Sequence, residues 1–181
     1  MNTPLDLVSA VLGTAVLFLQ VAGAVLLIAL CAPKTDFGRV VGTFAQNRVV
    51  LLGLLLSLGG FLGSLFLSGV VGFPPCVLCW WQRIFLYPQV FLFGLAFFRK
   101  DRSSFLLDAI LLLSGVGFII GVYHSFLPFL GGDSVFCSIG NGVSCAKLYI
   151  NAFGYITIPV MSATTFAVLI LLMLHARQRA P

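Results

Sequence analysis

The sequence predicts an all-α membrane protein, and three observations lead to this fold class. Hydrophobic residues make up 60% of the 181-residue chain, whereas only 8% of its residues are charged. A soluble domain contains roughly 25% charged residues, so most of this chain is expected in lipid. Five apolar segments are long enough to cross the hydrocarbon core, which takes about 20 helical residues. We place these segments at about 8–30, 49–71, 80–98, 106–127 and 156–174.

The distribution of basic residues predicts the orientation of the five segments. One side of the membrane receives the 31–48 loop, the 99–105 loop and the C-terminus. These parts hold eight of the ten basic residues: Lys34, Arg39, Arg48, Arg99, Lys100, Arg102, Arg177 and Arg179. Because cytoplasmic loops are enriched in Lys and Arg, this side is expected to be cytoplasmic, with the N-terminus outside. The same asymmetry accounts for the net charge of +5 without a nucleic-acid partner.

The first segment, at about 8–30, is interpreted as a permanent membrane span. It begins after Asp6 and lacks the basic residues that normally precede the apolar run of a secretory signal peptide. Cys31 follows at the end that we expect on the cytoplasmic side. The other four cysteines fall on the opposite side, where disulfides persist. We therefore expect Cys31 to take no part in their chemistry.

Glycines in the second and fourth segments predict close contacts between helices. Gly59 and Gly63 form a G-x-x-x-G spacing in the second segment, and Gly117 and Gly121 form another in the fourth. This spacing lets two helix backbones approach each other in lipid. We expect tight packing at these positions, with Gly121 as the one that could instead make room for a ligand near the outer end.

The third segment, at about 80–98, follows a stretch that contains a closely spaced cysteine pair. Residues 73–83 read Phe-Pro-Pro-Cys-Val-Leu-Cys-Trp-Trp-Gln-Arg, with two prolines that suit the entry to a helix but not its interior. A helix that begins at about Cys76 places Cys76, Cys79 and Arg83 on one face, because their spacing is i, i+3 and i+7. A helix N-terminus and a nearby cation both favour a thiolate over a thiol. This Cys-x-x-Cys pair is therefore predicted to be redox-active.

Two further groups accompany this pair on the predicted outer side. His124, at the end of the fourth segment, is expected at the depth of Arg83, although a single histidine there is more often a polar interface residue than a catalytic one. The 128–155 loop contains Cys137 and Cys145, separated by seven residues rich in turn formers. The loop is too short for a domain with its own core, and we expect a mobile arm.

The four outer cysteines allow three kinds of site. They could bind zinc, since Cys-x-x-Cys is a common half-site, but seven residues separate Cys137 from Cys145 where roughly two to four are usual. They could also form purely structural disulfides. A two-residue spacing at a helix start is typical of a redox-active pair, so we rank thiol–disulfide exchange first and expect no metal. Covalent haem attachment is excluded because Trp80, not histidine, follows Cys79.

The order of these motifs resembles the DsbB family of membrane thiol oxidoreductases, and within it the BdbC-like branch of disulfide formation proteins. The resemblance covers roughly residues 50–175. It rests on residues 75–84 with Tyr87-Pro88, then Tyr123-His124, then the loop cysteines, then residues 153–159. In the related vitamin K epoxide reductases the loop pair precedes the Cys-x-x-Cys motif, whereas here it follows. This order favours DsbB.

The resemblance implies a DsbB-like four-helix transmembrane bundle over residues 49–175, with 128–155 as its extracytoplasmic redox loop. Residues 1–48 would then supply one extra N-terminal transmembrane helix and a cytoplasmic loop, which is where the chain departs from the family pattern. Residues 176–181 would form a cytoplasmic tail. A member of this family is expected in the bacterial cytoplasmic membrane.

The resemblance also implies a reaction. The protein would reoxidise a soluble thioredoxin-like, DsbA-like thiol oxidase and pass the electrons to membrane quinone, either ubiquinone or menaquinone. Cys79 would be the thiolate that faces the quinone, and Cys76 its exchanging partner. Arg83 and His124 would contact the quinone oxygens, because a fixed cation and a hydrogen-bond donor in low dielectric stabilise the negative charge that develops there.

For the loop pair, the resemblance implies that Cys137 takes the mixed disulfide with the partner and that Cys145 resolves it. The short spacing between these two cysteines leaves open which of them is attacked first. The main rival hypothesis is a non-catalytic membrane subunit whose cysteines form a metal site or structural disulfides. Metal content and the redox state of the outer thiols distinguish the two hypotheses.

Overall fold

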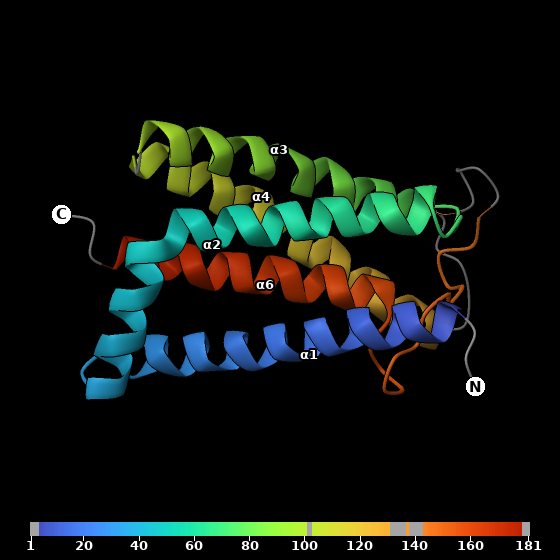
Figure 1. The fold of residues 1–181 in the computed structure, drawn as a ribbon, viewed down its shortest axis with the longest axis horizontal. Helices are drawn as coiled ribbons and strands as arrows, with labels where there is room; N and C mark the ends of the chain where they lie inside the picture. The colour runs from blue at the N-terminus through green and yellow to red at the C-terminus, as the bar shows by residue number, and fades with distance from the viewer. Residues whose placement is uncertain (1–3, 101–102, 131–136, 138–142, 179–181) are drawn as a thin grey trace.

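The computed structural model describes residues 4–100, 103–130, 137 and 143–178, and within these ranges the chain forms five long helices that run alternately in opposite directions (Figure 1). The helices are α1 (Pro4–Cys31), α2 (Asp36–Gly69), α3 (Val77–Arg99), α4 (Ser104–Phe126) and α6 (Ile158–Arg177), and a short 3₁₀ helix, η1 (Leu127–Phe129), follows α4. This architecture confirms the all-helical fold class that the sequence predicts.

Helices α2, α3, α4 and α6 form a closed bundle. Helix α2 contacts α3 and α6, and α4 contacts the same two helices. Helix α1 lies outside this ring, against α2 and α6. The centre of the bundle is filled by large apolar side chains that are almost fully buried, among them Phe93, Ile110, Phe166, Leu169 and Met173. Burial of such side chains holds the four helices together.

Four of the helices are long and apolar enough to cross a membrane: α1, α2, α4 with η1, and α6. Helix α3 is not among them, because it carries several polar side chains. One of these is Gln89, which is fully buried and accepts a hydrogen bond from the Ser114 hydroxyl of α4 at 3.1 Å. Polar groups of α3 are thus paired inside the bundle.

The predicted 31–48 loop is wrong over most of its length, because α2 already begins at Asp36. The Thr35 hydroxyl caps the helix by accepting a hydrogen bond from the Gly38 N–H at 3.1 Å, and Asp36 lies in the first turn, where a negative charge stabilises the helix dipole. Figure 1 shows that the first turns of α2 run across the end of the bundle before the helix bends to follow it.

The glycine contacts confirm the predicted packing at Gly117 and differ from the prediction at Gly121, Gly59 and Gly63. In α4, a Cβ added to Gly117 would lie 2.4 Å from the Phe166 ring, and one added to Gly121 would lie 3.1 Å from the Ala163 backbone. Both positions therefore serve packing, and the idea that Gly121 makes room for a ligand is wrong. In α2, an added Cβ at Gly59 or Gly63 would meet no heavy atom within 4 Å, so the tight packing expected there is wrong as well.

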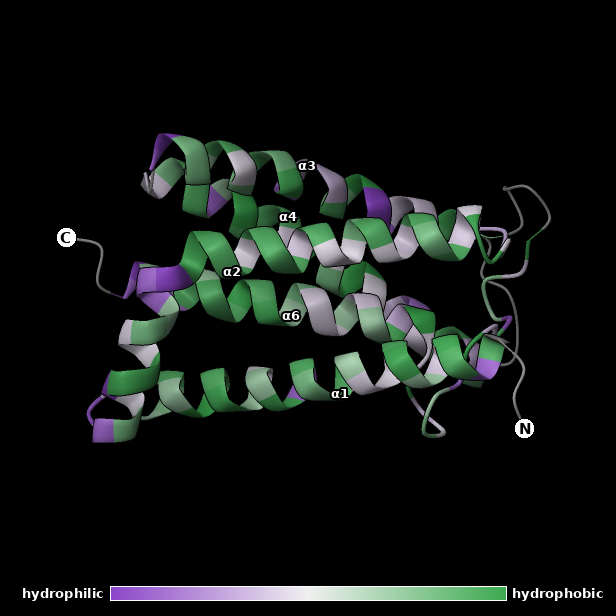
Figure 2. Ribbon diagram, in the orientation of Figure 1, coloured by the Kyte–Doolittle hydropathy of each residue, from purple (hydrophilic) through white to green (hydrophobic). Residues whose placement is uncertain are grey.

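The two ends of the bundle differ in chemistry. The start of α1, the turn before α3 and residues 143–157 lie at one end, and the α1–α2 turn and the ends of α3 and α6 lie at the other (Figure 1). Lys34, Arg99 and Arg177 belong to the second end, where Arg177 forms an ion pair with Asp108. Hydrophilic residues gather mainly at the helix ends (Figure 2).

Candidate redox site

The Cys-x-x-Cys pair lies at the N-terminus of α3. Cys76 is the N-cap residue, and its sulfur accepts a hydrogen bond from the Cys79 N–H at 3.4 Å. The sulfur atoms of Cys76 and Cys79 lie 3.2 Å apart as free thiols, with Cys76 buried and Cys79 half-buried. The prolines before Cys76 and the helix start at Val77 agree with the sequence prediction.

The surroundings of Cys76 favour its thiolate. The hydrogen bond with the Cys79 thiol lowers the pKa of Cys76 well below its usual range, and the nearby His124 lowers it further, whereas burial opposes both effects. The unpaired N–H groups at the start of α3 stabilise the same negative charge. The resemblance assigns the thiolate role to Cys79, but in this arrangement the hydrogen-bond donors converge on Cys76.

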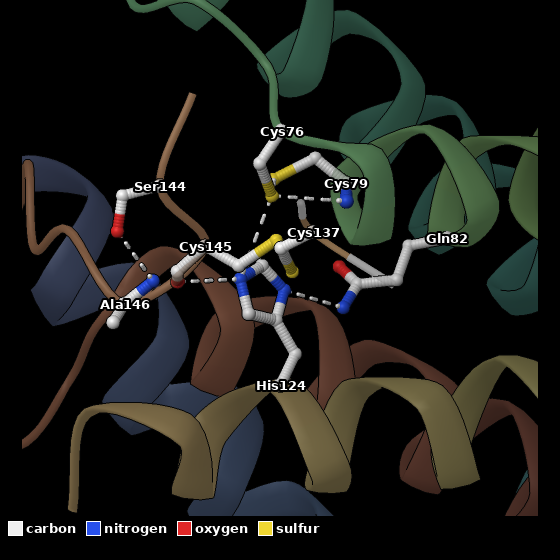
Figure 3. The surroundings of a disulfide bond; sticks show 8 residues. All are labelled: Cys76, Cys79, Gln82, His124, Cys137, Ser144, Cys145 and Ala146. Atoms are coloured by element: carbon white, nitrogen blue, oxygen red, sulfur yellow. Dashed lines mark hydrogen bonds between the residues drawn. A yellow bond between two sulfur atoms is a disulfide. The ribbon is translucent and has the colours of Figure 1, made fainter. Parts of the chain in front are cut away.

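His124 joins the cysteine pair to the outer loop. Its Nε2 lies 3.2 Å from the Cys145 carbonyl oxygen and 3.7 Å from the Cys76 sulfur. On the opposite side of the ring, the Gln82 amide donates to Nδ1 at 3.1 Å (Figure 3). This contact leaves the proton on Nε2, which then donates toward both the carbonyl and the sulfur. The imidazole is 2% exposed, so it belongs to the site and not to the membrane interface.

The second cysteine pair forms a disulfide beside the first. Cys137 is bonded to Cys145, and both residues are buried. They pack in one cluster with Cys76, Leu78 and Leu127, and Figure 3 shows the disulfide beside Cys76 and His124. Much of the predicted mobile arm, residues 131–136 and 138–142, lies outside the described residues. The loop disulfide itself lies against the bundle, in the same buried cluster as Cys76.

Arg83, on α3, is held by contacts with α2 and with a tryptophan of its own helix. Its guanidinium donates to the Ser64 carbonyl of α2 at 2.9 Å and lies over the Trp80 ring, 5.2 Å from the ring centroid. The Ser64 hydroxyl in turn shares a hydrogen bond with the Tyr87 hydroxyl at 2.8 Å. Arg83 is therefore fixed within the bundle and does not extend toward solvent as a surface cation.

A cavity of about 420 Å³ connects these groups. Cys76, Cys79, Arg83 and His124 line it together with Gln82, Cys145, Lys147 and several hydroxyl-bearing side chains, and most of the remaining lining is apolar. Gly59 and Gly63 also line it, and the missing side chains at these positions leave the space open. A volume in the range of about 300–1,000 Å³, apolar walls and a few convergent polar groups are typical of small-molecule sites.

This cavity fits a quinone. An added Cβ at Gly59 or Gly63 would meet no heavy atom within 4 Å, so these positions leave cavity space that side chains would fill. The Arg83 guanidinium keeps N–H groups beyond the one bonded to the Ser64 carbonyl and is a donor of the kind that a quinone oxygen accepts, and the His124 Nε2–H becomes a second one when it leaves the Cys145 carbonyl. The donor set and the open glycine face thus agree with the cofactor that the resemblance implies.

Sequence reasoning missed two residues of the site. Gln82 is 6% exposed and orients His124, while Ser64 provides the backbone carbonyl that holds Arg83. Both are polar residues within apolar segments, and this is the signal that could have identified them, since polar groups at membrane depth face partners and not lipid.

A metal ion is the alternative occupant of the same cluster. One donor atom each from Cys76, Cys79 and His124 lies within 4.8 Å of the others, and zinc commonly takes such ligands. The sulfurs of Cys137 and Cys145 are bonded to each other and so do not complete the set. The expectation that the protein binds no metal stays a prediction.

Fold and site together define a membrane protein whose two cysteine pairs meet at one end of a helical bundle, which is the arrangement of a membrane thiol–disulfide oxidoreductase. The chain belongs to the DsbB family: the family model described as "Disulfide bond formation protein DsbB" matches residues 46–176. That range includes all four cysteines of the site and excludes α1.

Curated relatives carry names of the same kind. The chain is 42% identical over 119 residues to the SPbeta prophage-derived disulfide bond formation protein B of Bacillus subtilis, covering 66% of this chain and 78% of the relative. It is 36% identical over 130 residues to disulfide bond formation protein C of the same organism, covering 71% and 93%. A probable disulfide formation protein of Oceanobacillus iheyensis is 38% identical over 135 residues, covering 72% and 88%. No solved structure was found to match the chain.

Proposed function

We propose that this membrane oxidoreductase is a protein dithiol:quinone oxidoreductase that reoxidises a soluble thioredoxin-like thiol oxidase. One observation carries the proposal: both cysteines of the pair, Arg83 and His124 line a single cavity whose other walls are mostly apolar. An apolar cavity with a dithiol at one end suits a lipid-soluble oxidant. The names of the relatives support the disulfide-forming part of the proposal.

Arg83 and His124 are the residues that would hold the quinone. A bound quinone supplies an acceptor for two electrons and two protons. Arg83 keeps a fixed positive charge in the cavity lining, and His124 would present its Nε2–H once it leaves the Cys145 carbonyl, so both would stabilise negative charge that develops on an oxygen nearby. Gln82 keeps the imidazole in the tautomer that donates.

The two cysteine pairs would act in sequence. A dithiol of the soluble partner reduces the Cys137–Cys145 disulfide through a mixed disulfide, and the partner leaves with a new disulfide bond. The loop dithiol then exchanges with a Cys76–Cys79 disulfide, which restores the loop disulfide and leaves the second pair reduced. The Cys76–Cys79 dithiol finally gives up two electrons and two protons and closes again. The burial of the loop disulfide beside Cys76 supports the second exchange.

We infer an orientation in the bacterial cytoplasmic membrane with the redox end outside. The basic residues at the opposite end of the bundle support this placement. Tags at the two termini are therefore expected to report opposite sides, with the N-terminal tag accessible from outside intact cells and the C-terminal tag protected. If both tags report one side, the number of membrane-crossing helices and the placement of the cysteines are wrong.

The proposal is tested with the purified protein, a reduced thioredoxin-like partner and a soluble short-chain quinone. Loss of the oxidised quinone's ultraviolet absorbance is expected only when all three are present, and Cys76→Ser is expected to abolish it. Zinc analysis of the same sample tests the rival function. One bound zinc per chain with no quinone consumption would favour a metal site formed by the Cys76, Cys79 and His124 cluster.

A further inference from the structure

We propose that α1, the helix outside the region matched by the family model, forms one wall of the cavity and contacts the bound quinone, so that it helps to determine which quinones the site accepts. This inference rests on the proposed function. It starts from the cavity lining, to which α1 contributes Leu12, Ala15, Val16 and Leu19. The spacing i, i+3, i+4 and i+7 places these residues on one face of the helix.

Contacts near both ends of this face fix the position of α1. A Cβ added to Gly13 would lie 2.6 Å from the Ala152 Cβ, so the backbone of α1 fits closely against the outer loop. About two turns further along, the Gln20 side chain accepts a hydrogen bond from the Tyr155 hydroxyl at 2.8 Å and donates to the Thr164 hydroxyl of α6 at 3.4 Å. The placement of α1 is therefore specific, and its face toward the cavity is defined.

The chemistry of the two sides of the cavity differs. Cys79 and Arg83 come from α3, His124 from α4 and Lys147 from the outer loop, so the reactive and charged groups of the lining all lie outside α1. The α1 face offers only aliphatic side chains, which contact apolar parts of a ligand: the ring substituents or the isoprenoid chain. A helix that touches those parts distinguishes quinones by size and substitution, without taking part in electron transfer.

Ala15 is the position where this role can be tested with least disturbance of the fold. Its side chain lines the cavity and is exposed, so a larger side chain there enters the cavity and does not displace a buried neighbour. Ala10 is a matched control, because it lies on the same helix, is also exposed and is not part of the cavity lining.

The variants Ala15→Trp and Ala10→Trp are compared with the wild type by equilibrium binding of a short-chain ubiquinone and a short-chain menaquinone in detergent. We expect Ala15→Trp to weaken binding by at least about tenfold, and more for the larger ring, because the indole takes up cavity volume that the quinone would otherwise fill. Ala10→Trp should bind as the wild type does. Equal Tm values of the three proteins without quinone show that the fold is intact.

A labelling experiment on the wild type gives a second readout that needs no variant. A photoreactive azido-quinone is bound and activated, and the modified peptides are mapped by mass spectrometry. Label is expected within residues 12–19 as well as on α3 or α4. Label restricted to α2, α3, α4 and α6, or unchanged binding by Ala15→Trp, overturns the role of α1 and leaves the proposed function standing. Failure of the wild type to bind either quinone overturns both.

Discussion

Replacing Cys145 with serine is expected to stop turnover and to trap a covalent adduct between Cys137 and the thioredoxin-like partner. The variant keeps Cys137 as a free thiol, so oxidised partner is added: Cys137 attacks the partner's disulfide, one partner thiol is released, and no Cys145 thiol is present to displace the partner from Cys137. The adduct should be visible on a non-reducing gel and should disappear on reduction. This is the largest effect that the proposed relay predicts, because it converts a transient species into the main product.

Cys31→Ser is the matched control for this experiment. Cys31 is an exposed free thiol at the end of α1, at the opposite end of the bundle from the redox site. Its replacement should leave turnover close to that of the wild type and trap no adduct. If an adduct forms through Cys76 while the loop cysteines are dispensable, the relay is wrong and a simpler oxidoreductase with a single cysteine pair takes its place.

Arg83→Ala is expected to raise the apparent KM for quinone by about ten- to a hundredfold while thiol exchange with the partner changes much less. The structure places the guanidinium in the cavity lining, held by the Ser64 carbonyl. A hydrogen bond to a charged group contributes about 1.5–3 kcal/mol, and each 1.4 kcal/mol corresponds to a factor of about ten. Steady-state kinetics with varied quinone and saturating partner measure the effect.

Arg83→Lys separates the role of charge from that of geometry. Lysine keeps the positive charge but lacks the planar fork that reaches Ser64 and lies over Trp80, so an intermediate KM is expected. If the quinone KM is unchanged in Arg83→Ala, Arg83 does not contact the quinone and serves only to hold α3 against α2. In that case the Tm, and not the KM, should fall.

The number of long helices and the Cys76–Cys79 pair at a helix start could be predicted from the sequence, because both depend on local patterns. Apolar segments of sufficient length predict the helices. Two prolines before Cys76 predict where α3 starts. The start of α2 at Asp36 was missed, since a polar run beside an apolar segment gives little indication of whether the helix continues through it.

The surroundings of the cysteines could not be predicted, because they depend on contacts between distant parts of the chain. The hydrogen bond from Gln82 to His124 joins α3 to α4, and the packing of Cys145 beside Cys76 brings the outer loop onto the bundle. The glycines show the same limit. The two G-x-x-x-G motifs cannot be distinguished by sequence. In the structure, however, Gly117 packs against Phe166, whereas Gly63 faces the cavity.

The central claim, that the disulfides are made at the expense of quinone, is tested most directly by stoichiometry without oxygen. The purified protein is mixed anaerobically with excess reduced partner and a limiting amount of quinone, and partner disulfides and quinol are counted at the end. We predict one disulfide formed for each quinone consumed, whereas Cys76→Ser should consume no quinone and form at most the one disulfide per chain that its preformed Cys137–Cys145 bond supplies. Partner oxidation that continues without quinone, or quinone that stays oxidised while disulfides accumulate, would contradict the account.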